Sequence, residues 1–196
     1  MKKILLILLI SFLIIVVGLA IYFSLTTEVT KNLDSYIYDL PYKEGTSHKV
    51  VQGYGGMFSH KYKSALDFSM AVGTPVYAAR EDIIYSSKED SDEGGPWPSY
   101  QNKANYIIVM HDDGSFGCYW HLQKNGVVVN KGRIAKGQLI GFSGRTGFVL
   151  RPHLHFAVKR KLTYDKDSFV RTKFRTTNGA QLLNKGEVYI KPGQTD

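Results

Sequence analysis

The central part of the chain, from residue 50 to residue 160, contains no segment that keeps a helical spacing of apolar residues over ten positions. Short apolar runs alternate instead with glycine-containing turns such as Gly73-Thr-Pro75 and Asp112-Asp-Gly-Ser115. Short strands separated by such turns are typical of antiparallel sheets. The 19 glycines, 13 tyrosines and 10 phenylalanines favour the same class. The sequence therefore predicts an all-β domain built from a glycine-cornered antiparallel β-sheet.

The N-terminal segment has a different character, because residues 4–25 contain neither a charged residue nor a proline. At about 1.5 Å per residue, a helix of this length crosses a hydrocarbon core of about 30 Å. Lys2 and Lys3 precede it, which favours a cytoplasmic N-terminus and a domain on the extracytoplasmic side, in the periplasm or the wall. We expect one N-terminal transmembrane helix that tethers the domain to the cytoplasmic membrane. The alternative is a signal sequence cleaved near Gly18-Leu19-Ala20, which would give a secreted protein.

These features divide the chain into four parts. Residues 1–25 are the predicted anchor or signal sequence, and the polar residues 26–46 are a predicted linker. Residues 47–160 form the predicted β-domain. Residues 161–196 are a predicted C-terminal β extension, with strands at Phe169–Phe174 and Glu187–Ile190 that close over the core.

The charge and the cysteine content exclude several classes of protein. The net charge of +8 suits an anionic partner such as a nucleic acid, a membrane or an acidic wall polymer. A basic-aromatic RNA-binding module is absent from the sequence, so we predict no nucleic-acid partner. A single cysteine, Cys118, rules out an intrachain disulfide and a multi-cysteine zinc site. Because Cys118 alternates with Phe116 and Trp120, we expect it to pack in the core and not to act as a nucleophile.

The segment Arg151-Pro-His-Leu-His-Phe156 carries the first candidate site. In a strand, His153 and His155 point to one face and Leu154 and Phe156 to the other. Histidine is the commonest nitrogen ligand of zinc and titrates near neutral pH. The pair could bind a metal, move protons, divide these tasks, or be two ordinary exposed strand residues.

Further candidates lie earlier in the chain. His60 ends a glycine-rich loop, and Asp67 alternates with Leu66 and Phe68, so its carboxylate needs a partner, a metal or a solvated face. His121 follows Tyr119, and strict alternation predicts that these two side chains share a face. We predict a structural role for His111.

The long connection from Lys88 to Ala104 contains two aromatic side chains, Trp97 and Tyr100. We expect them to line a substrate groove, and the alternative is a plain surface excursion.

A zinc hydrolase binds its metal through three protein side chains and leaves a fourth position to water. Two histidines and one carboxylate would make such a site here, and the remaining histidines could transfer protons. The sequence has no His-Glu-x-x-His motif, so the base would be a histidine.

Four motifs, in this order, carry a specific resemblance. They are His60…Ala65-Leu-Asp67-Phe, Gly73-Thr-Pro-Val-Tyr-Ala-Ala, Tyr119-Trp-His121-Leu and His153-Leu-His155-Phe. Over residues 47–160 the chain resembles the lysostaphin/LytM-type peptidoglycan zinc metalloendopeptidases. Asp82 and Trp120 depart from the family pattern, which usually has a glycine and a small residue at these positions.

The resemblance implies a barrel-sandwich fold of the duplicated-hybrid-motif type and makes residues 47–160 a metallopeptidase β-domain. It implies Zn²⁺ bound by His60, Asp67 and His155, with His121 and His153 catalytic. The implied function is hydrolysis of peptide bonds in peptidoglycan stems or cross-bridges. Two alternatives remain: a catalytically silent cell-wall-binding or amidase-activating module on the same fold, and a histidine phosphocarrier of the sugar phosphotransferase type.

Overall fold

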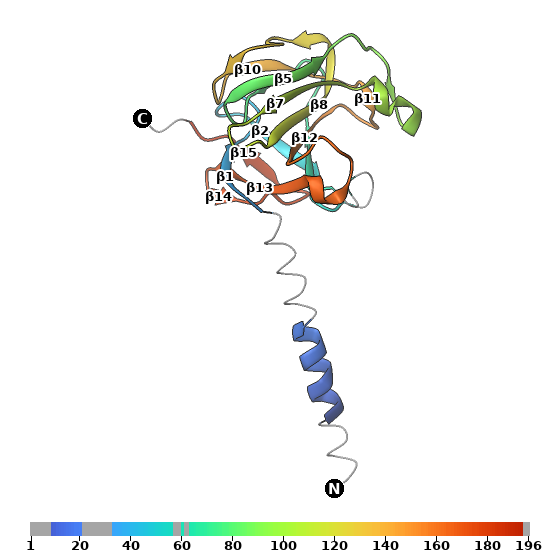
Figure 1. Ribbon diagram of the computed structural model, residues 1–196, viewed down its shortest axis with the longest axis vertical. Coiled ribbons are helices and arrows are strands. Elements are labelled where there is room, and N and C mark those ends of the chain that lie inside the picture. Colours follow the sequence, from blue (N-terminus) through green and yellow to red (C-terminus); the bar gives the residue numbers. More distant parts are fainter. Residues whose placement is uncertain (1–8, 21–32, 57–59, 61–62, 194–196) are drawn as a thin grey trace. The chain divides into compact units, whose positions relative to one another are not determined.

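The computed structural model describes residues 9–20, 33–56, 60 and 63–193, and divides into two units, Met1–Leu33 and Asp34–Asp196. The described part of the first unit is a helix over residues 9–20 (Figure 1). In the described part of the chain, no helix has the length and apolar character needed to cross a membrane. The predicted transmembrane segment, residues 4–25, lies partly outside the described residues.

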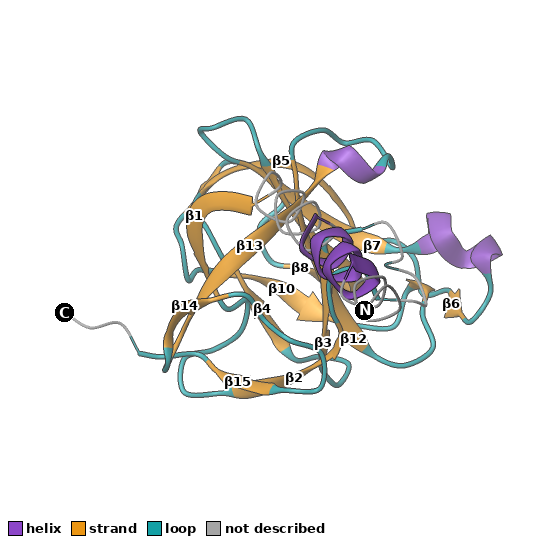
Figure 2. Ribbon diagram, turned by 90° about the horizontal axis from the view of Figure 1, so that it is seen from below, coloured by secondary structure: helices purple, strands orange, loops and turns teal. Residues whose placement is uncertain are grey.

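Strands, drawn orange in Figure 2, are the main regular elements of the second unit, and loops and turns connect them. The strands are β1 (Leu33–Asp39), β2 (Ser47–Gln52), β3 (Ala65–Ser69), β4 (Pro75–Tyr77), β5 (Asp82–Lys88), β6 (Gly94–Gly95), β7 (Asn105–Met110), β8 (Phe116–Val127), β9 (Arg133–Ile134), β10 (Leu139–Ser143), β11 (Gly147–Phe148), β12 (His153–Lys159), β13 (Phe169–Thr176), β14 (Gly179–Gln181) and β15 (Val188–Ile190). Two 3₁₀ turns, η1 (Pro98–Lys103) and η2 (Lys166–Ser168), complete the unit. The predicted all-β class is therefore confirmed.

The strands pair in the order β15-β2-β3-β12-β8-β7-β5-β9. Figure 1 shows β5, β7 and β8 side by side in this sheet. Further strands extend it, because β10 pairs with β8 and β4, and β13 pairs with β12, β1 and β14. All of these pairings whose register is defined are antiparallel, and among the described residues the short β6–β11 pair is parallel. The β7–β8 hairpin turns at the predicted Asp112–Ser115 segment.

One face of β3 and β12 packs against the main hydrophobic core. Leu66 and Phe68 of β3, and Leu154 and Phe156 of β12, are fully or almost fully buried there. Burying a side chain of this size contributes roughly 1.5–3 kcal/mol. The opposite face of the same two strands is left for polar groups and for a small cluster of Ala65, Ala157 and Phe169. Cys118 is fully buried, and burial raises the pKa of its thiol to about 12, as expected for a packing residue and not for a nucleophile.

The prediction that residues 26–46 form a linker is wrong for the described residues 33–46. Residues 33–39 form β1, and Tyr38, Leu40 and Tyr42 have no exposed surface and belong to the main core. The hydroxyl of Tyr42 donates a hydrogen bond to the carbonyl of Tyr189 at 2.7 Å. Three large side chains at alternate positions anchor the end of β1 and the residues after it in the core, although the polar neighbours give this segment the composition of a spacer. Residues 26–32 lie outside the described residues.

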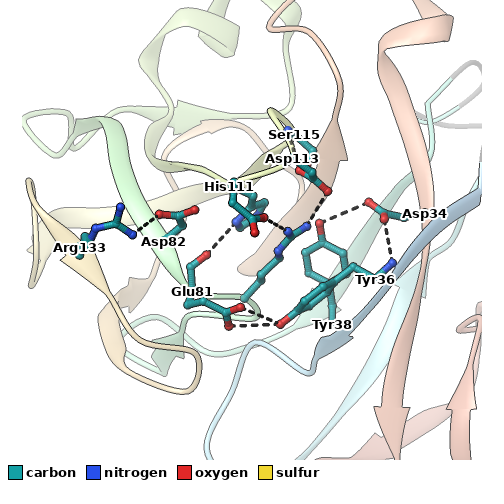
Figure 3. Close-up of polar contacts among 11 residues, drawn as sticks. Asp34, Tyr36, Tyr38, Glu81, Asp82, His111, Asp113, Ser115 and Arg133 are labelled. Atoms are coloured by element: carbon teal, nitrogen blue, oxygen red, sulfur yellow. Dashed lines mark hydrogen bonds and ion pairs between the residues drawn. The ribbon is translucent and has the colours of Figure 1, made fainter.

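Polar contacts also hold β1 in place, as Figure 3 shows. The hydroxyl of Tyr36 lies 3.2 Å from a carboxylate oxygen of Glu81, and the hydroxyl of Tyr38 donates to Asp34 at 3.4 Å. The guanidinium of Arg80 stacks on the ring of Tyr36 at 4.1 Å and donates to Asp113 at 2.9 Å. Arg80 therefore connects β1 to the turn of the β7–β8 hairpin.

The two strands predicted in the C-terminal extension are confirmed as β13 and β15. β13 pairs with β12, and β15 pairs with β2. Phe174 and Tyr189 belong to the main core. The extension therefore completes the same hydrophobic core as the central strands.

Candidate metal centre

The candidate site begins with the pairing of β3 and β12. These strands are antiparallel, and His155 lies directly opposite Asp67. Leu154 and Phe156 are buried in the core, so His153 and His155 both project from the other face, as the alternation predicts. The strand register therefore brings a histidine pair and a carboxylate to one surface.

His60 comes from the loop after β2 and completes a group of three. Its Nε2 lies 3.2 Å from His155 Nδ1 and 3.3 Å from Asp67 Oδ1, and His155 Nδ1 lies 2.9 Å from Asp67 Oδ1. Ligands about 2.0–2.2 Å from a tetrahedral zinc ion are separated from one another by about 3.3 Å. The donor atoms of His60, Asp67 and His155 thus have the spacing and chemistry that suit a single zinc ion.

The burial of this group fits a metal site. His60 has no exposed surface, and Asp67 is 7% exposed. A buried carboxylate is costly unless it is paired, hydrogen-bonded or bound to a cation. Burial would raise the pKa of Asp67, but hydrogen bonds from His155 and His60 outweigh it and hold that pKa well below its usual range. The carboxyl is therefore ionised at neutral pH, as a metal ligand must be.

The imidazole of His155 is in a complementary state. Burial lowers its pKa to about 4, although the neighbouring Asp67 opposes this shift. The ring is therefore neutral at neutral pH, and a neutral imidazole is the form that ligates metals. Nδ1 of His60 lies 3.1 Å from the carbonyl of Gly53, and its Nε2 faces Asp67 and His155. With Nδ1–H donated to this carbonyl, Nε2 is the nitrogen that would bind a cation together with Asp67 and His155.

His121 and His153 lie at the edge of this group. Their ring centroids are 4.7 Å apart, and Nε2 of His153 is 3.7 Å from Asp67 Oδ1. Nδ1–H of His121 donates a hydrogen bond to the backbone carbonyl of Thr146, and Nδ1–H of His153 donates one to the carbonyl of Arg151, both at 2.7 Å. The same tautomer is thereby fixed in both rings, and their Nε2 atoms can accept a proton. Burial, followed by the neighbouring His153 and His155, holds the pKa of His121 well below its usual value.

The prediction that Tyr119 and His121 share a face is wrong. Tyr119 belongs to the main core, where its ring lies 5.0 Å from that of Phe156, whereas His121 contacts the histidines on the other side. A bulge causes the change, because Asn105 pairs with Leu122 while the next residue, Tyr106, pairs with Trp120. His121 is the extra residue and has a φ of +68°. A bulge inverts the alternation of the strand, and at this position it turns the histidine towards the site.

Two pockets open beside the metal centre, and both are lined by His121, Phe148 and His155. The first, the lysine pocket, has a volume of about 310 Å³, and its lining also includes Lys63 and Lys159. The second, the loop pocket, has a volume of about 410 Å³ and is bounded by Val149–Pro152. Both pockets therefore adjoin the candidate ligand His155.

The expectation that Trp97 and Tyr100 line a substrate groove is not met in either pocket. The lysine pocket is lined from this loop by Pro98 and Gln101 instead. Trp97 is 66% exposed, and the ring of Tyr100 covers Gly95. The prediction chose Trp97 and Tyr100 because aromatic side chains are common in binding sites. Nothing in the sequence distinguishes Pro98 and Gln101 from ordinary loop residues.

The sequence interpretation also missed Lys63 and Lys159 as pocket residues. Lys159 could have been found from the spacing in β12, since residues 153, 155, 157 and 159 share one face of a strand. Lys63 lies in a loop, where periodicity gives no direction.

An all-β unit that brings two histidines and a buried carboxylate together beside open pockets is the arrangement of a mononuclear metallohydrolase. Residues 61–167 match the family model of peptidase family M23. The matched segment includes Asp67, His121, His153 and His155. This segment is more than half of the chain, so the chain belongs to peptidase family M23, whose members are zinc-dependent metallopeptidases. The predicted resemblance is therefore confirmed.

Similar proteins include the peptidoglycan DD-endopeptidase ShyA of Vibrio cholerae, 35% identical over 91 residues that cover 46% of this chain and 18% of that protein. The glycyl-glycine endopeptidase ALE-1 of Staphylococcus capitis is 40% identical over 91 residues, covering 46% of this chain and 23% of that protein. The chain thus spans about a fifth of the length of these relatives. The structure of lysostaphin from Staphylococcus simulans aligns with 62% of this chain and 46% of its own, at 29% identity and a TM-score of 0.46.

Proposed function

We propose that this protein is a zinc endopeptidase that hydrolyses peptide bonds in peptidoglycan stems or cross-bridges. The observation that carries the proposal is the grouping of His60, Asp67 and His155, whose donor atoms all lie within 4.8 Å of one another. Membership of family M23 supports it, as do the peptidoglycan endopeptidases among the similar proteins.

In this proposal His60, Asp67 and His155 hold the zinc ion. Zinc, when bound, supplies Lewis acidity towards the scissile carbonyl and towards the attacking water. Asp67 would contribute the single negative charge of the ligand set, and the two imidazoles would bind the ion through uncharged nitrogen atoms. The buried setting strengthens the electrostatic interactions of these groups with a cation.

His121 and His153 are assigned to proton transfer and to the oxyanion. The depressed pKa of His121 keeps its Nε2 unprotonated at neutral pH, so this atom can take a proton from the attacking water and pass it to the leaving amine. His153 lies beside it and, when its Nε2 carries a proton as well as its Nδ1, can donate from Nε2 to the negative charge that develops on the carbonyl oxygen. The carbonyls of Thr146 and Arg151 keep both rings in position through the catalytic cycle.

The proposal includes export and tethering to the cytoplasmic membrane by residues 4–25. Their apolar composition supports it, as do Lys2 and Lys3 in front of them and the helix over residues 9–20. A wall substrate lies outside the cytoplasm, which requires the domain to be on the extracytoplasmic side. The alternative is secretion after cleavage of the segment.

The decisive experiment uses the purified full chain and purified sacculi, with and without a chelator, and with zinc restored after chelation. New amino and carboxyl ends are identified by mass spectrometry, with His153→Ala as the matched inactive control. We expect new ends only with metal-loaded wild type. A protein that retains stoichiometric zinc and produces no new end from sacculi of several cross-link types would instead support the silent wall-binding or amidase-activating module.

A further inference from the structure

The lysine pocket contains a feature that the proposed chemistry does not use. Its lining places the side chains of Lys63 and Lys159 in the same pocket as His121 and His155. Lys159 is the last residue of β12 and is only 6% exposed. A buried ammonium group is costly unless an anion or several hydrogen bonds compensate for it.

The contacts of Lys159 compensate only in part. Its Nζ donates to the carbonyl of Thr163 and lies 4.5 Å from the ring centroid of Phe169 and 5.0 Å from that of Tyr164. The ring of Tyr164 also lies beneath Lys63 Nζ, at 5.8 Å. The two positive charges therefore approach the same aromatic ring.

Neither lysine has an acidic partner at ion-pair distance. Within the part of the chain that the structure describes, no carboxylate oxygen lies within 4.0 Å of either Nζ. The carboxylate of Asp165, which is near Lys159 in the chain, instead accepts hydrogen bonds from Thr163 and from the backbone of Ser168. Two cations that share a pocket without a carboxylate between them leave room for an anion from outside.

The remaining walls of the pocket indicate what kind of anion fits. Trp120, Phe148, Ala157 and Phe169 line it with apolar surface, and the metal centre forms one side. A peptide segment that combines methylene groups with a free carboxylate, as a γ-linked Glu does, would place its methylene groups on these walls and its charge at the lysines. A free inorganic anion would leave the apolar surface uncovered.

We propose that Lys63 and Lys159 form a specificity subsite that binds a free carboxylate of the substrate peptide, close to the bond that is cut. This inference rests on the proposed peptidase function for the identity of the substrate. The lysines act by binding and positioning, so their loss is expected to weaken recognition of acidic substrates without removing the zinc.

The parent protein of the test is the zinc-loaded full chain with His153→Ala, in which bound peptide stays intact. Its binding of two forms of one peptide is compared. The peptides are L-Ala-γ-D-Glu-L-Lys-D-Ala with free carboxyl groups and the same peptide with both carboxyls converted to carboxamides. Isothermal titration should give a dissociation constant about tenfold lower for the acid form, as expected for one charge-assisted contact. Lys63→Gln and Lys159→Gln should each reduce this ratio to below about threefold.

Lys131→Gln is the matched control, because it removes the same charge from an exposed residue outside the pocket. It should keep the ratio of the parent protein. If Lys159→Gln fails to fold, as judged by circular dichroism and zinc content, Lys63→Gln decides the result, since its side chain is half-buried in a loop. A ratio near one in the parent, or an unchanged ratio in both lysine variants, overturns the subsite.

Turnover is measured separately with the chain that keeps His153, with and without the lysine substitutions. The proposed peptidase activity and the proposed subsite can then fail independently. A normal preference for the acid peptide in binding, together with no cleavage of any peptidoglycan, would contradict the peptidase and leave the subsite in place. Cleavage of acid and amide substrates with equal kcat/KM would contradict the subsite and leave the peptidase in place.

Discussion

Nδ1 of His155 lies 2.9 Å from Oδ1 of Asp67, and the two residues are directly paired across the β3–β12 ladder. Their separation is therefore fixed by backbone hydrogen bonds and not by loop conformation. A shift of one residue in this register would move one of the side chains to the core face. The strand pairing thus preorganises two of the three candidate ligands before any metal binds.

The first prediction concerns metal retention. Asp67→Ala and His155→Ala should each lose stoichiometric zinc, because two ligands cannot hold the ion against dialysis. Zinc per chain is measured by elemental analysis after dialysis against a weak chelator. His111→Gln is the control, since it removes a histidine that belongs neither to the candidate metal centre nor to the pockets beside it. Retention of one zinc per chain by either alanine variant would refute the ligand assignment.

The second prediction separates ligands from catalytic groups. His153→Ala and His121→Ala should keep zinc but lose about 10²–10⁴-fold in turnover, the usual contribution of a general acid or base. Zinc content and the rate of release of new amino groups from sacculi are measured on the same preparations. Turnover equal to wild type in His153→Ala would show that this side chain takes no part in the reaction.

A third prediction uses the backbone of Asp82, which has a φ of +130°. A side chain in this region is strained, and glycine is not, which explains why a glycine is usual here in the family that the sequence resembles. We expect Asp82→Gly to be more stable to urea than Asp82→Ala by about 1–2 kcal/mol. Both variants lose the 2.8 Å contact with Arg133, so their difference reports the backbone alone. Equal stability of the two variants would mean that the backbone is not strained.

The fourth prediction is a pH dependence of stability. His111 is buried, its Nδ1–H donates to the carbonyl of Glu81, and its Nε2 has no hydrogen-bond partner among the described residues. Burial lowers the pKa of His111 below that of the unfolded chain, about 6.5. The unfolded state therefore binds a proton that the folded state does not, and stability falls as the pH is lowered below about 6.5.

The measurement compares urea unfolding of wild type and His111→Gln between pH 5 and pH 8. Because the other histidines titrate in both proteins, the difference in slope isolates His111. We expect the wild type to lose more stability than the variant between pH 6.5 and pH 5. Parallel curves over this range would contradict the prediction.

The fifth prediction tests whether β1 belongs to the folded unit. Tyr38→Ala should cost about 3 kcal/mol or more, because it leaves a cavity among the rings of Phe156 and Phe174. The neighbouring Ile37 is 41% exposed, and Ile37→Ala should cost well under 1 kcal/mol. Urea unfolding of both variants checks the contrast. A small effect of Tyr38→Ala would restore the view that this segment is a linker.

Much of the site could be predicted from local patterns. The alternation of His153 and His155 with Leu154 and Phe156 fixes which side chains face the core, because a strand has a period of two. The glycine-containing turns predicted the class of fold and the β7–β8 hairpin. The strands of the C-terminal segment were also visible, since each is a short apolar run between polar residues.

Local patterns failed where pairing between distant strands changed the local rule. The bulge in β8 reverses the direction of His121, and it exists only because β7 pairs with one residue fewer on that side. The composition of β1 is that of a polar spacer. Its burial depends on contacts of the Tyr38 ring with Phe156 and Phe174, which are more than 100 residues away in the sequence.

The sequence by itself determined the residue types of the centre and the face of β12 on which two of them lie, because periodicity is a property of a single strand. Only the tertiary structure decided that His60, Asp67 and His155 come within a few ångströms of one another, and that Lys63 shares a pocket with Lys159. These distances depend on which strands become neighbours. That choice is made by burial of the whole core and is not encoded in any one segment.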